Sequence, residues 1–184
     1  MTDSPKEKRF QALVMPHLNS AFNLACWLTR TRPDAEDVVQ EAYLRAFKFF
    51  DSFHGDDGRA WLLTIVRNTF YSWHQQNRIQ NTLFDEQCHS PDGEHVVATQ
   101  YVENNPENLL MQKDSQQQLL KALQALPLEF REVMVLRELE DLSYKQIAAI
   151  VGIPIGTVMS RLGRGRKLLE KVLAPAATPI RQEI

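Results

Sequence analysis

Apolar residues recur every three to four positions along most of the chain, and this spacing places side chains on one face of an α-helix. In the first half of the chain the pattern predicts three helices, over residues 9–30, 34–50 and 60–76. Pro16 is expected to kink the first helix or to mark a later start, because proline lacks the N–H that a helix interior needs. Asp34 is expected to cap the second helix. The first half is therefore predicted to be a helical block.

The helical pattern is lost from residue 79 to about residue 106, where the chain becomes acidic and rich in Asn and Gln. A stretch of this composition is typical of a linker. Helical spacing returns over residues 107–126, stops at Pro127 and resumes over residues 129–138. The chain is therefore predicted to contain two helical blocks separated by a spacer.

The stretch 142–171 carries the most informative local signals. Ser143 and Gln146 have the spacing of a capping box, in which each side chain bonds the backbone N–H of the other residue at a helix start. Gly152 can adopt the left-handed conformation of a turn, and Pro154 can begin the next helix, where a missing N–H costs little. A short helix, a glycine turn and a second helix together predict a helix-turn-helix.

Composition agrees with an all-helical protein. The chain has 184 residues, of which 43% are hydrophobic and 24% are charged, with only seven glycines and nine prolines. This composition is typical of a globular protein with one ordinary or two small domains, and it excludes a fibrous chain and a large multidomain enzyme. The predicted fold class is all-α, with two small helical domains joined by a flexible acidic linker.

The formal net charge of −2 hides a segregation of charge along the chain. Residues 81–114 include seven acids and one base, whereas residues 161–171 include five bases and one acid. On the second helix of the predicted helix-turn-helix, one face is apolar and comprises Val158, Leu162, Gly165 and Leu169. The other face carries hydroxyls and bases, which can bond base edges and phosphates. The pattern favours DNA binding over the alternative, a solvated basic face on a structural helix pair.

Residues that would support catalysis, metal binding or secretion are few and scattered. Two cysteines, Cys26 and Cys88, are too few for a disulfide framework. Cys88 lies near His89 and His95, but without metal-ligand spacing, so the group is interpreted as incidental and no cofactor is predicted. No Gly-rich phosphate loop or nucleophile elbow occurs, so we do not expect an enzyme. Neither a signal-peptide pattern nor an apolar run of about 20 residues occurs, so we expect a reduced cytosolic protein without membrane insertion.

Three stretches carry a resemblance to a known family. They read DAEDVVQEAYLRAF at 34–47, RAWLLTIVRNTFYSW at 59–73 and LSYKQIAAIVGIPIGTVMSRLGRGRKLL at 142–169. In these motifs, their order and their spacing, the chain resembles the extracytoplasmic-function (ECF) group of bacterial sigma-70 family sigma factors. The resemblance implies four segments, which are sigma region 2 at 1–80, a flexible acidic linker at 81–112, sigma region 4 at 113–175 and a tail at 176–184.

The acidic start of the second predicted helix is the first site that the resemblance interprets. Residues 34–41 include four acids and no base, and Asp37 and Glu41 lie one helical turn apart. Like charges at that spacing destabilise an isolated helix slightly and so favour a basic partner, although a merely solvated helix start would have the same pattern. In the family this surface docks on the clamp helices of the polymerase β′ subunit, and the β flap is a further contact. The residues expected to bind polymerase are Asp34, Asp37, Gln40, Glu41, Leu44 and Arg45.

By the same resemblance, the loop 51–59 and the helix 60–76 bind the minus-ten promoter element and trap a flipped base as the duplex opens. A turn-rich loop suits a pocket for an extruded base, and aromatic residues can stack on unpaired bases, although most aromatics here are expected in the core. The helix ends in HQQNR, at 74–78, where the family often has more bases, so attraction to the DNA backbone should be weaker. The minus-ten candidates are Phe53, His54, Asp56, Trp61, Arg67, Asn68, Tyr71, His74, Gln75 and Arg78.

The helix-turn-helix is implied to place its second helix in the major groove of the minus-thirty-five element. Gly163 and Gly165 lie inside that helix, and each costs about 1 kcal/mol relative to alanine, so the helix is expected to fray until a partner holds it. The minus-thirty-five candidates are Ser143, Thr157, Ser160, Arg161, Arg164, Arg166 and Lys167.

The function implied is a sigma factor that binds core RNA polymerase, directs it to specific promoters and helps to melt them, in a stress or environmental response. Promoter DNA and an anti-sigma factor are the other expected partners, and the bacterial cytoplasm is the expected location. The residues alone leave two alternatives. A conventional helix-turn-helix regulator should bind a palindrome as a dimer without polymerase, and a protein-interaction module should ignore promoter sequence.

Overall fold

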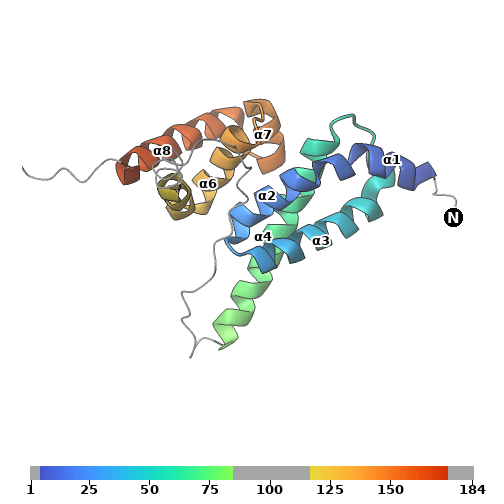
Figure 1. Cartoon of the computed structure of the whole chain (residues 1–184), viewed down its shortest axis with the longest axis horizontal. Coiled ribbons are helices and arrows are strands. Elements are labelled where there is room, and N and C mark those ends of the chain that lie inside the picture. The colour runs from blue at the N-terminus through green and yellow to red at the C-terminus, as the bar shows by residue number, and fades with distance from the viewer. Residues whose placement is uncertain (1–4, 85–116, 174–184) are drawn as a thin grey trace, which may run out of the picture.

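The computed structural model describes residues 5–84 and 117–173, except for the side chains of residues 78–84. All regular secondary structure in these two ranges is helical, and it forms two packed groups of helices (Figure 1). The all-α prediction is confirmed for this part of the chain. Most of the predicted linker and all of the predicted tail lie outside the described residues, although residues 81–84 belong to a helix.

The first group of helices lies within residues 5–84. Its elements are α1 (Pro5–Leu13), η1 (Met15–His17), α2 (Leu18–Thr29), α3 (Arg32–Phe49), η2 (Phe50–Ser52) and α4 (Gly58–Phe84). The expectation that Pro16 kinks the first predicted helix or marks a later start is confirmed, because a short 3-10 turn, η1, separates α1 from α2. Pro16 lies in this turn, where its missing N–H removes the bond that would continue α1.

Helix α3 starts earlier than the hydrophobic pattern predicts, at Arg32, and Thr31 rather than Asp34 is its N-cap. The Thr31 hydroxyl oxygen accepts a hydrogen bond from the Asp34 N–H at 3.3 Å and donates to the Asp34 carboxylate at 2.5 Å. The prediction that Asp34 caps this helix is wrong because Pro33 fits the first helical turn, where no N–H is needed, so the helix can begin before it.

Helix α4 extends well beyond its predicted end, to Phe84. At its start the Asp57 carboxylate accepts a hydrogen bond from the Ala60 N–H at 2.9 Å. This bond lowers the pKa of Asp57, because it stabilises the charged carboxylate. A side chain at Gly58 would collide with the carbonyl oxygen of Leu13, so only glycine lets the end of α1 approach the start of α4 this closely.

Helices α2, α3 and α4 pack against one another around the core of the first group (Figure 1). The buried side chains come from the positions that helical spacing predicts, among them Leu24, Leu28, Val38, Ala42, Leu62, Val66 and Phe70. Full burial of a Val, Leu or Phe side chain contributes about 1.5–3 kcal/mol, so burial at these positions stabilises the first group.

The second group of helices lies within residues 117–173. Its elements are a helix over residues 117–125, α6 (Leu128–Met134), η3 (Val135–Leu139), α7 (Tyr144–Val151) and α8 (Ile155–Leu173). Pro127 precedes α6, at the predicted break. The predicted helix over 129–138 is present, but η3 is a π-helical turn, which is wider than an α-helical one. The predicted helix over 107–126 is described only from residue 117 onward.

The helix-turn-helix prediction is confirmed. Ser143 Oγ accepts from the Gln146 N–H at 3.3 Å, and the Ser143 N–H donates to the Gln146 side chain at 3.0 Å, which completes the capping box of α7. Gly152 has φ 73° and ends α7 in the left-handed conformation. The buried side of α8 consists of the four predicted residues, Val158, Leu162, Gly165 and Leu169.

Gly165 lies where α8 packs against α6. A Cβ at this position would lie 3.0 Å from Met134 Cγ and 3.6 Å from Phe130 Cβ, so the missing side chain allows the two helices to pack closely. Helix α8 is continuous through Gly163 and Gly165, and the fraying expected in the absence of a partner stays a prediction. The contact with α6 at Gly165 offsets part of the helix propensity that this glycine loses.

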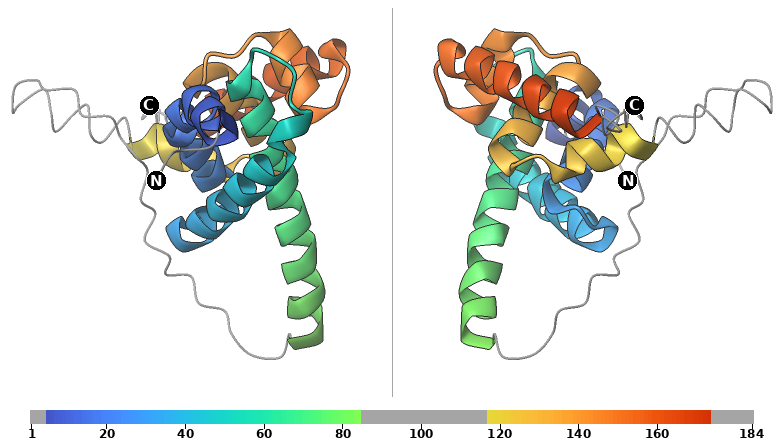
Figure 2. Two further views of the ribbon diagram at one scale, coloured as in Figure 1. Left: turned by 90° about the vertical axis from the view of Figure 1, so that its right-hand side faces the viewer. Right: turned by 90° about the vertical axis from the view of Figure 1, so that its left-hand side faces the viewer.

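The two groups of helices pack directly against each other. Helix α4 contacts α7, and α2 contacts α6 and η3, while α8 lies on the side of the second group that faces away from the first (Figure 2). In the described ranges no single helix is long and apolar enough to cross a membrane. The pair α7 and α8 has the length and composition when taken together, but the two helices are bent by 101°.

Candidate polymerase and DNA interfaces

The outer side of α3 is an acidic surface with an apolar side chain beside it. This acidic surface of α3 comprises Asp37, Gln40, Glu41, Leu44 and Arg45. Leu44 is 69% exposed. Arg45 Nε donates to the Glu41 carboxylate at 2.7 Å, so the repulsion between Glu41 and Asp37 is partly offset within the helix. Five of the six residues expected to bind polymerase thus lie together, whereas Asp34 is bonded to the N-cap.

The loop before α4 is anchored by aromatic stacking. Phe53 is 7% exposed, and its ring stacks on that of Trp61 with centroids 4.6 Å apart. Arg9 Nη2 donates to the Phe53 carbonyl at 3.1 Å and ties the loop to α1. Phe53 is therefore buried and supports the loop, and Trp61 is half-buried beside it, while the expectation that Phe53 contacts DNA stays a prediction. His54 and Asp56 are exposed in the loop.

The polar face of α4 is partly exposed and partly covered. Its exposed candidates are Asn68, His74 and Gln75. Arg67 and Tyr71 are instead covered by the second group of helices, where both bond Glu132. Arg78 belongs to α4, but its side chain lies outside the described part of the chain. The structure therefore does not bring all the minus-ten candidates to one open surface.

Glu132 of α6 is buried between the two groups, with 1% of the residue exposed. Its carboxylate accepts hydrogen bonds from Arg67 Nε at 2.6 Å and from the Tyr71 hydroxyl at 3.3 Å. The Arg67 guanidinium also lies over the Tyr71 ring, 4.5 Å from its centre. Burial raises the pKa of Glu132, because a buried carboxylate loses its hydration, and the positive charge of Arg67 opposes part of that rise.

A second buried acid, Glu140, follows η3 and is 5% exposed. Its carboxylate accepts hydrogen bonds from Arg59 Nη2 at 2.5 Å and from Asn23 Nδ2 at 2.6 Å. Nearby, Gln146 Nε2 donates to the Asp57 carboxylate at 2.9 Å. Two carboxylates of the second group thus bond two arginines of the first.

The sequence pattern did not reveal this interface, although it contains one signal for it. Glu132 and Glu140 fall among the apolar positions of residues 128–142, and a buried acid needs a partner. The partners Arg67 and Arg59 lie 65 and 81 residues away in the chain, and no local pattern indicates such a distance.

The outward side of α8 is basic. Its exposed candidates are Ser160, Arg164, Arg166 and Lys167. Two arginines of α8 pair with acids of the same group of helices: Arg166 Nη2 donates to Glu138 at 2.8 Å, and the partly buried Arg161 lies 3.5 Å from Glu129. The bond from Glu138 raises the pKa of Arg166, because it stabilises the charged guanidinium. The basic side of α8 therefore has some cations in ion pairs and others open to solvent.

Two of the minus-thirty-five candidates, at the starts of α7 and α8, are less available for contacts than expected. Thr157 is half-buried, and the Ser143 hydroxyl is engaged in the capping box of α7. Ile155 and Met159, which the sequence analysis did not single out, are 46% and 55% exposed next to the basic residues. Exposed apolar side chains on such a helix suit the methyl group of thymine.

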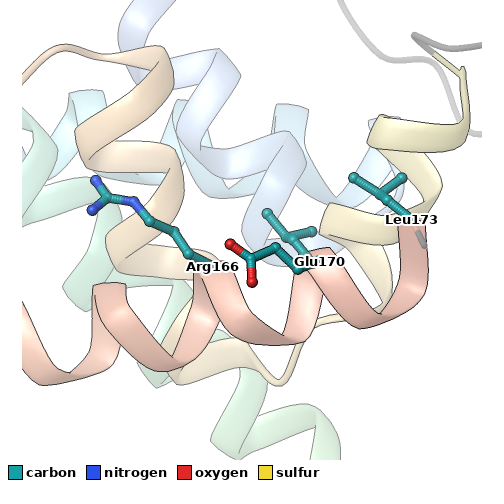
Figure 3. A pocket seen from close by; sticks show the side chains of 4 residues that line it. Arg166, Glu170 and Leu173 are labelled. Atoms are coloured by element: carbon teal, nitrogen blue, oxygen red, sulfur yellow. The ribbon is translucent and has the colours of Figure 1, made fainter.

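Other candidate chemistry is sparse. A hollow of about 450 Å³ at the end of α8 is lined by Arg166, Leu169, Glu170 and Leu173. Figure 3 shows Arg166, Glu170 and Leu173 along this helix. One base, one acid and two leucines on an open surface do not form a catalytic set. The described residues include no group of His, Cys, Asp and Glu that could hold a metal ion. Cys88, His89 and His95 lie outside the described residues.

Known proteins match both groups of helices. Residues 13–79 match the family model for Sigma-70 region 2, and residues 116–169 match that for Sigma-70, region 4. The chain is 34% identical over 173 residues to the ECF RNA polymerase sigma-E factor of Escherichia coli strain K12, which covers 92% of this chain and 88% of that protein. The chain belongs to the ECF sigma factors.

Further relatives and solved structures agree. This sigma factor is 34% identical over 163 residues to SigE of Mycolicibacterium smegmatis, over 88% of this chain and 60% of that protein. The sigma factor RpoE of Bartonella quintana, solved with the anti-sigma factor NepR, has a TM-score of 0.71 and 31% identity, over 90% of this chain and 97% of that one. CnrH, solved with the cytosolic domain of CnrY, shares the fold at a TM-score of 0.58 and 24% identity, over 91% and 88% of the two chains. This sigma factor is a transcription initiation factor that binds core RNA polymerase and promoter DNA.

Proposed function

We propose that this sigma factor docks on core RNA polymerase through the acidic surface of α3 and reads promoters with residues of α4 and α8. The observation that carries the proposal is the separation of opposite charges, with acids exposed on α3 and bases exposed on α8. An acidic surface fits a basic partner, for which we propose the β′ clamp helices, whereas a basic helix face fits DNA. Region 4 would also contact the β flap.

For the minus-thirty-five element, α8 would enter the major groove. Arg164 and Lys167 are exposed and, among the described residues, make no ion pair, so both are available to bases and phosphates. Arg161 and Arg166 would exchange their carboxylate partners for phosphates. Ser160 would add a hydroxyl contact.

For the minus-ten element, the loop 53–57 and α4 would hold the opened strand. The proposed contacts are His54, Asp56, Asn68, His74, Gln75 and Arg78, with Trp61 as a support for the loop. Arg67 and Tyr71 would join them only when the second group of helices leaves α4, because Glu132 covers both in this structure. The proposed segments are region 2 at 1–80, a linker at 81–112, region 4 at 113–175 and a tail at 176–184.

The proposed regulator is an anti-sigma factor, and the similarity to RpoE solved with NepR supports that choice. We place the protein beside its polymerase in the bacterial cytoplasm, in a stress or environmental response. We assign it neither a catalytic reaction nor a cofactor, because its proposed work is binding and the melting of DNA.

The proposal is tested by reversing two charges on α3. Asp37→Lys with Glu41→Lys should weaken binding to purified bacterial core RNA polymerase by at least about 100-fold, because juxtaposed like charges cost several kcal/mol. Binding is measured by fluorescence anisotropy of the labelled sigma factor, and run-off transcription from a genomic fragment library reports promoter use. The control is Asp51→Lys with Glu138→Lys, the same charge change elsewhere on the surface. Equal binding by the two variants would remove the acidic surface of α3 from the docking site.

A further inference from the structure

The interface between the two groups of helices places acids of region 4 on basic and polar residues of region 2. Glu132 contacts Arg67 and Tyr71, and Glu140 contacts Arg59, with the distances given above. Both carboxylates are almost fully buried. Buried ions of this kind need partners, so the contacts specify where the two groups meet.

Arg67 is one of the residues of α4 that we assign to promoter DNA, and Arg59 lies in the first turn of the same helix, beside the loop that we assign to the opened strand. The two arginines are eight residues apart, so they lie about 12 Å apart along the helix axis. A guanidinium group binds carboxylate and phosphate with the same fork of donors. Glu132 and Glu140 therefore occupy donors that DNA phosphates would otherwise use, and the two contacts exclude each other.

The distance between the two promoter elements is a second reason why the closed chain cannot bind a promoter. Elements centred 25 base pairs apart lie about 85 Å apart along B-form DNA. A compact body of this number of residues is only about 40 Å across. The closed chain cannot reach both elements, so the two groups of helices must separate before a promoter is bound.

We propose that Glu132 and Glu140 form a latch that holds the free chain closed, by occupying Arg67 and Arg59 with carboxylates where promoter DNA places phosphates. The proposal rests on the proposed function for the role of α4, but the latch itself is a property of the free chain. Polymerase docking opens it by separating the two groups. The outward side of α8 stays exposed in the closed state, so the latch covers the minus-ten reader and leaves the minus-thirty-five reader free.

The latch is tested on the free full-length chain by small-angle X-ray scattering. Glu132→Lys with Glu140→Lys places cations against Arg59 and Arg67, so the radius of gyration should rise by about 20% or more over that of the compact wild type. The matched control is Glu129→Lys with Glu138→Lys. These two acids lie in the same segment and give the same charge change, but they pair with α8, so the control should stay as compact as the wild type.

A charge swap distinguishes opening of the interface from misfolding of the variant. Adding Arg59→Glu and Arg67→Glu to the open variant restores opposite charges across the interface and should return the radius of gyration to the wild-type value. Circular dichroism of every variant should show the wild-type helix content. The latch is excluded if the wild type is already as extended as the open variant, if reversal leaves the chain compact, or if the swap stays open.

The competition with DNA is tested by anisotropy of a fluorescein-labelled forked DNA of mixed sequence at about 50 mM salt. The open variant should bind it at least about 10-fold more tightly than Asp37→Lys with Glu41→Lys, which has the same net charge and leaves the acids beside α8 in place, because only the open variant exposes α4. Equal binding would overturn the competition. Run-off transcription tests the sigma function separately, so a chain that opens as described but directs no transcription would disprove the function and not the latch.

Discussion

The hydroxyl of Tyr43 on α3 is buried and makes no hydrogen bond within the described residues. Its ring contacts the edge of Phe10, with centroids 6.3 Å apart, so the side chain packs as an apolar residue would. Burial raises the pKa of Tyr43 to about 12, because the tyrosinate would lose its hydration. The hydroxyl is thus a cost to the fold.

We expect Tyr43→Phe to raise the free energy of unfolding at pH 8 by up to about 1 kcal/mol, because no hydrogen bond is lost. The effect should grow with pH. The tyrosine ionises in the unfolded chain near its ordinary pKa of 10 but resists ionisation in the folded chain until about pH 12, so wild-type stability falls across that range. Urea unfolding of both proteins at pH 8 and pH 11 measures this. A less stable variant at pH 8 would mean that the hydroxyl has a partner.

Two glycines differ in the space around them. A Cβ at Gly58 would strike the backbone of Leu13, whereas a Cβ at Gly163 would meet nothing within 4 Å. Gly58→Ala should therefore destabilise the protein, because backbone must move. Gly163→Ala should stabilise it by about 1 kcal/mol through helix propensity. Thermal unfolding compares the two, and similar melting temperatures would show that α1 is not held closely against α4.

At the scale of elements, the capping box of α7 provides a direct test of local structure. Ser143→Ala removes the side-chain acceptor for the Gln146 N–H and should lower the free energy of unfolding by about 1 kcal/mol. Ser160→Ala, at an exposed position on α8, is the control and should change stability little. Urea unfolding measures both variants. Equal losses would mean that the box contributes nothing beyond the loss of a serine.

Local patterns predicted the elements well where the cause is local. The capping box, the glycine turn and the buried side of α8 all arise from neighbouring residues, and each was predicted. The cap at Thr31 and the closeness of Gly58 to Leu13 were not predicted, because they depend on where a proline is tolerated and on how α1 meets α4. The burial of Phe53 was missed for the same reason, since its ring packs on a neighbouring element.

At the scale of the whole molecule, the buried contact between the two groups is expected to be marginal in strength. Burial raises the pKa of Glu132 and the charge of Arg67 lowers it, so the desolvation of the carboxylate offsets part of the attraction between the two groups. Apolar packing must supply the rest of the free energy of closure. A weakly held closed state can be opened by a partner that binds only the open one.

Glu140 directly follows the π-helical turn η3, so the width of this turn determines the direction in which the Glu140 side chain points. One residue fewer in that turn would rotate everything after it by about 100° around the helix axis. A homologue with an ordinary α-helix at this point could have both glutamates and both arginines, and its Glu140 would still not meet Arg59. The presence of all four side chains in a homologue would then not show that it adopts the closed state. The length of this turn would be the better indicator.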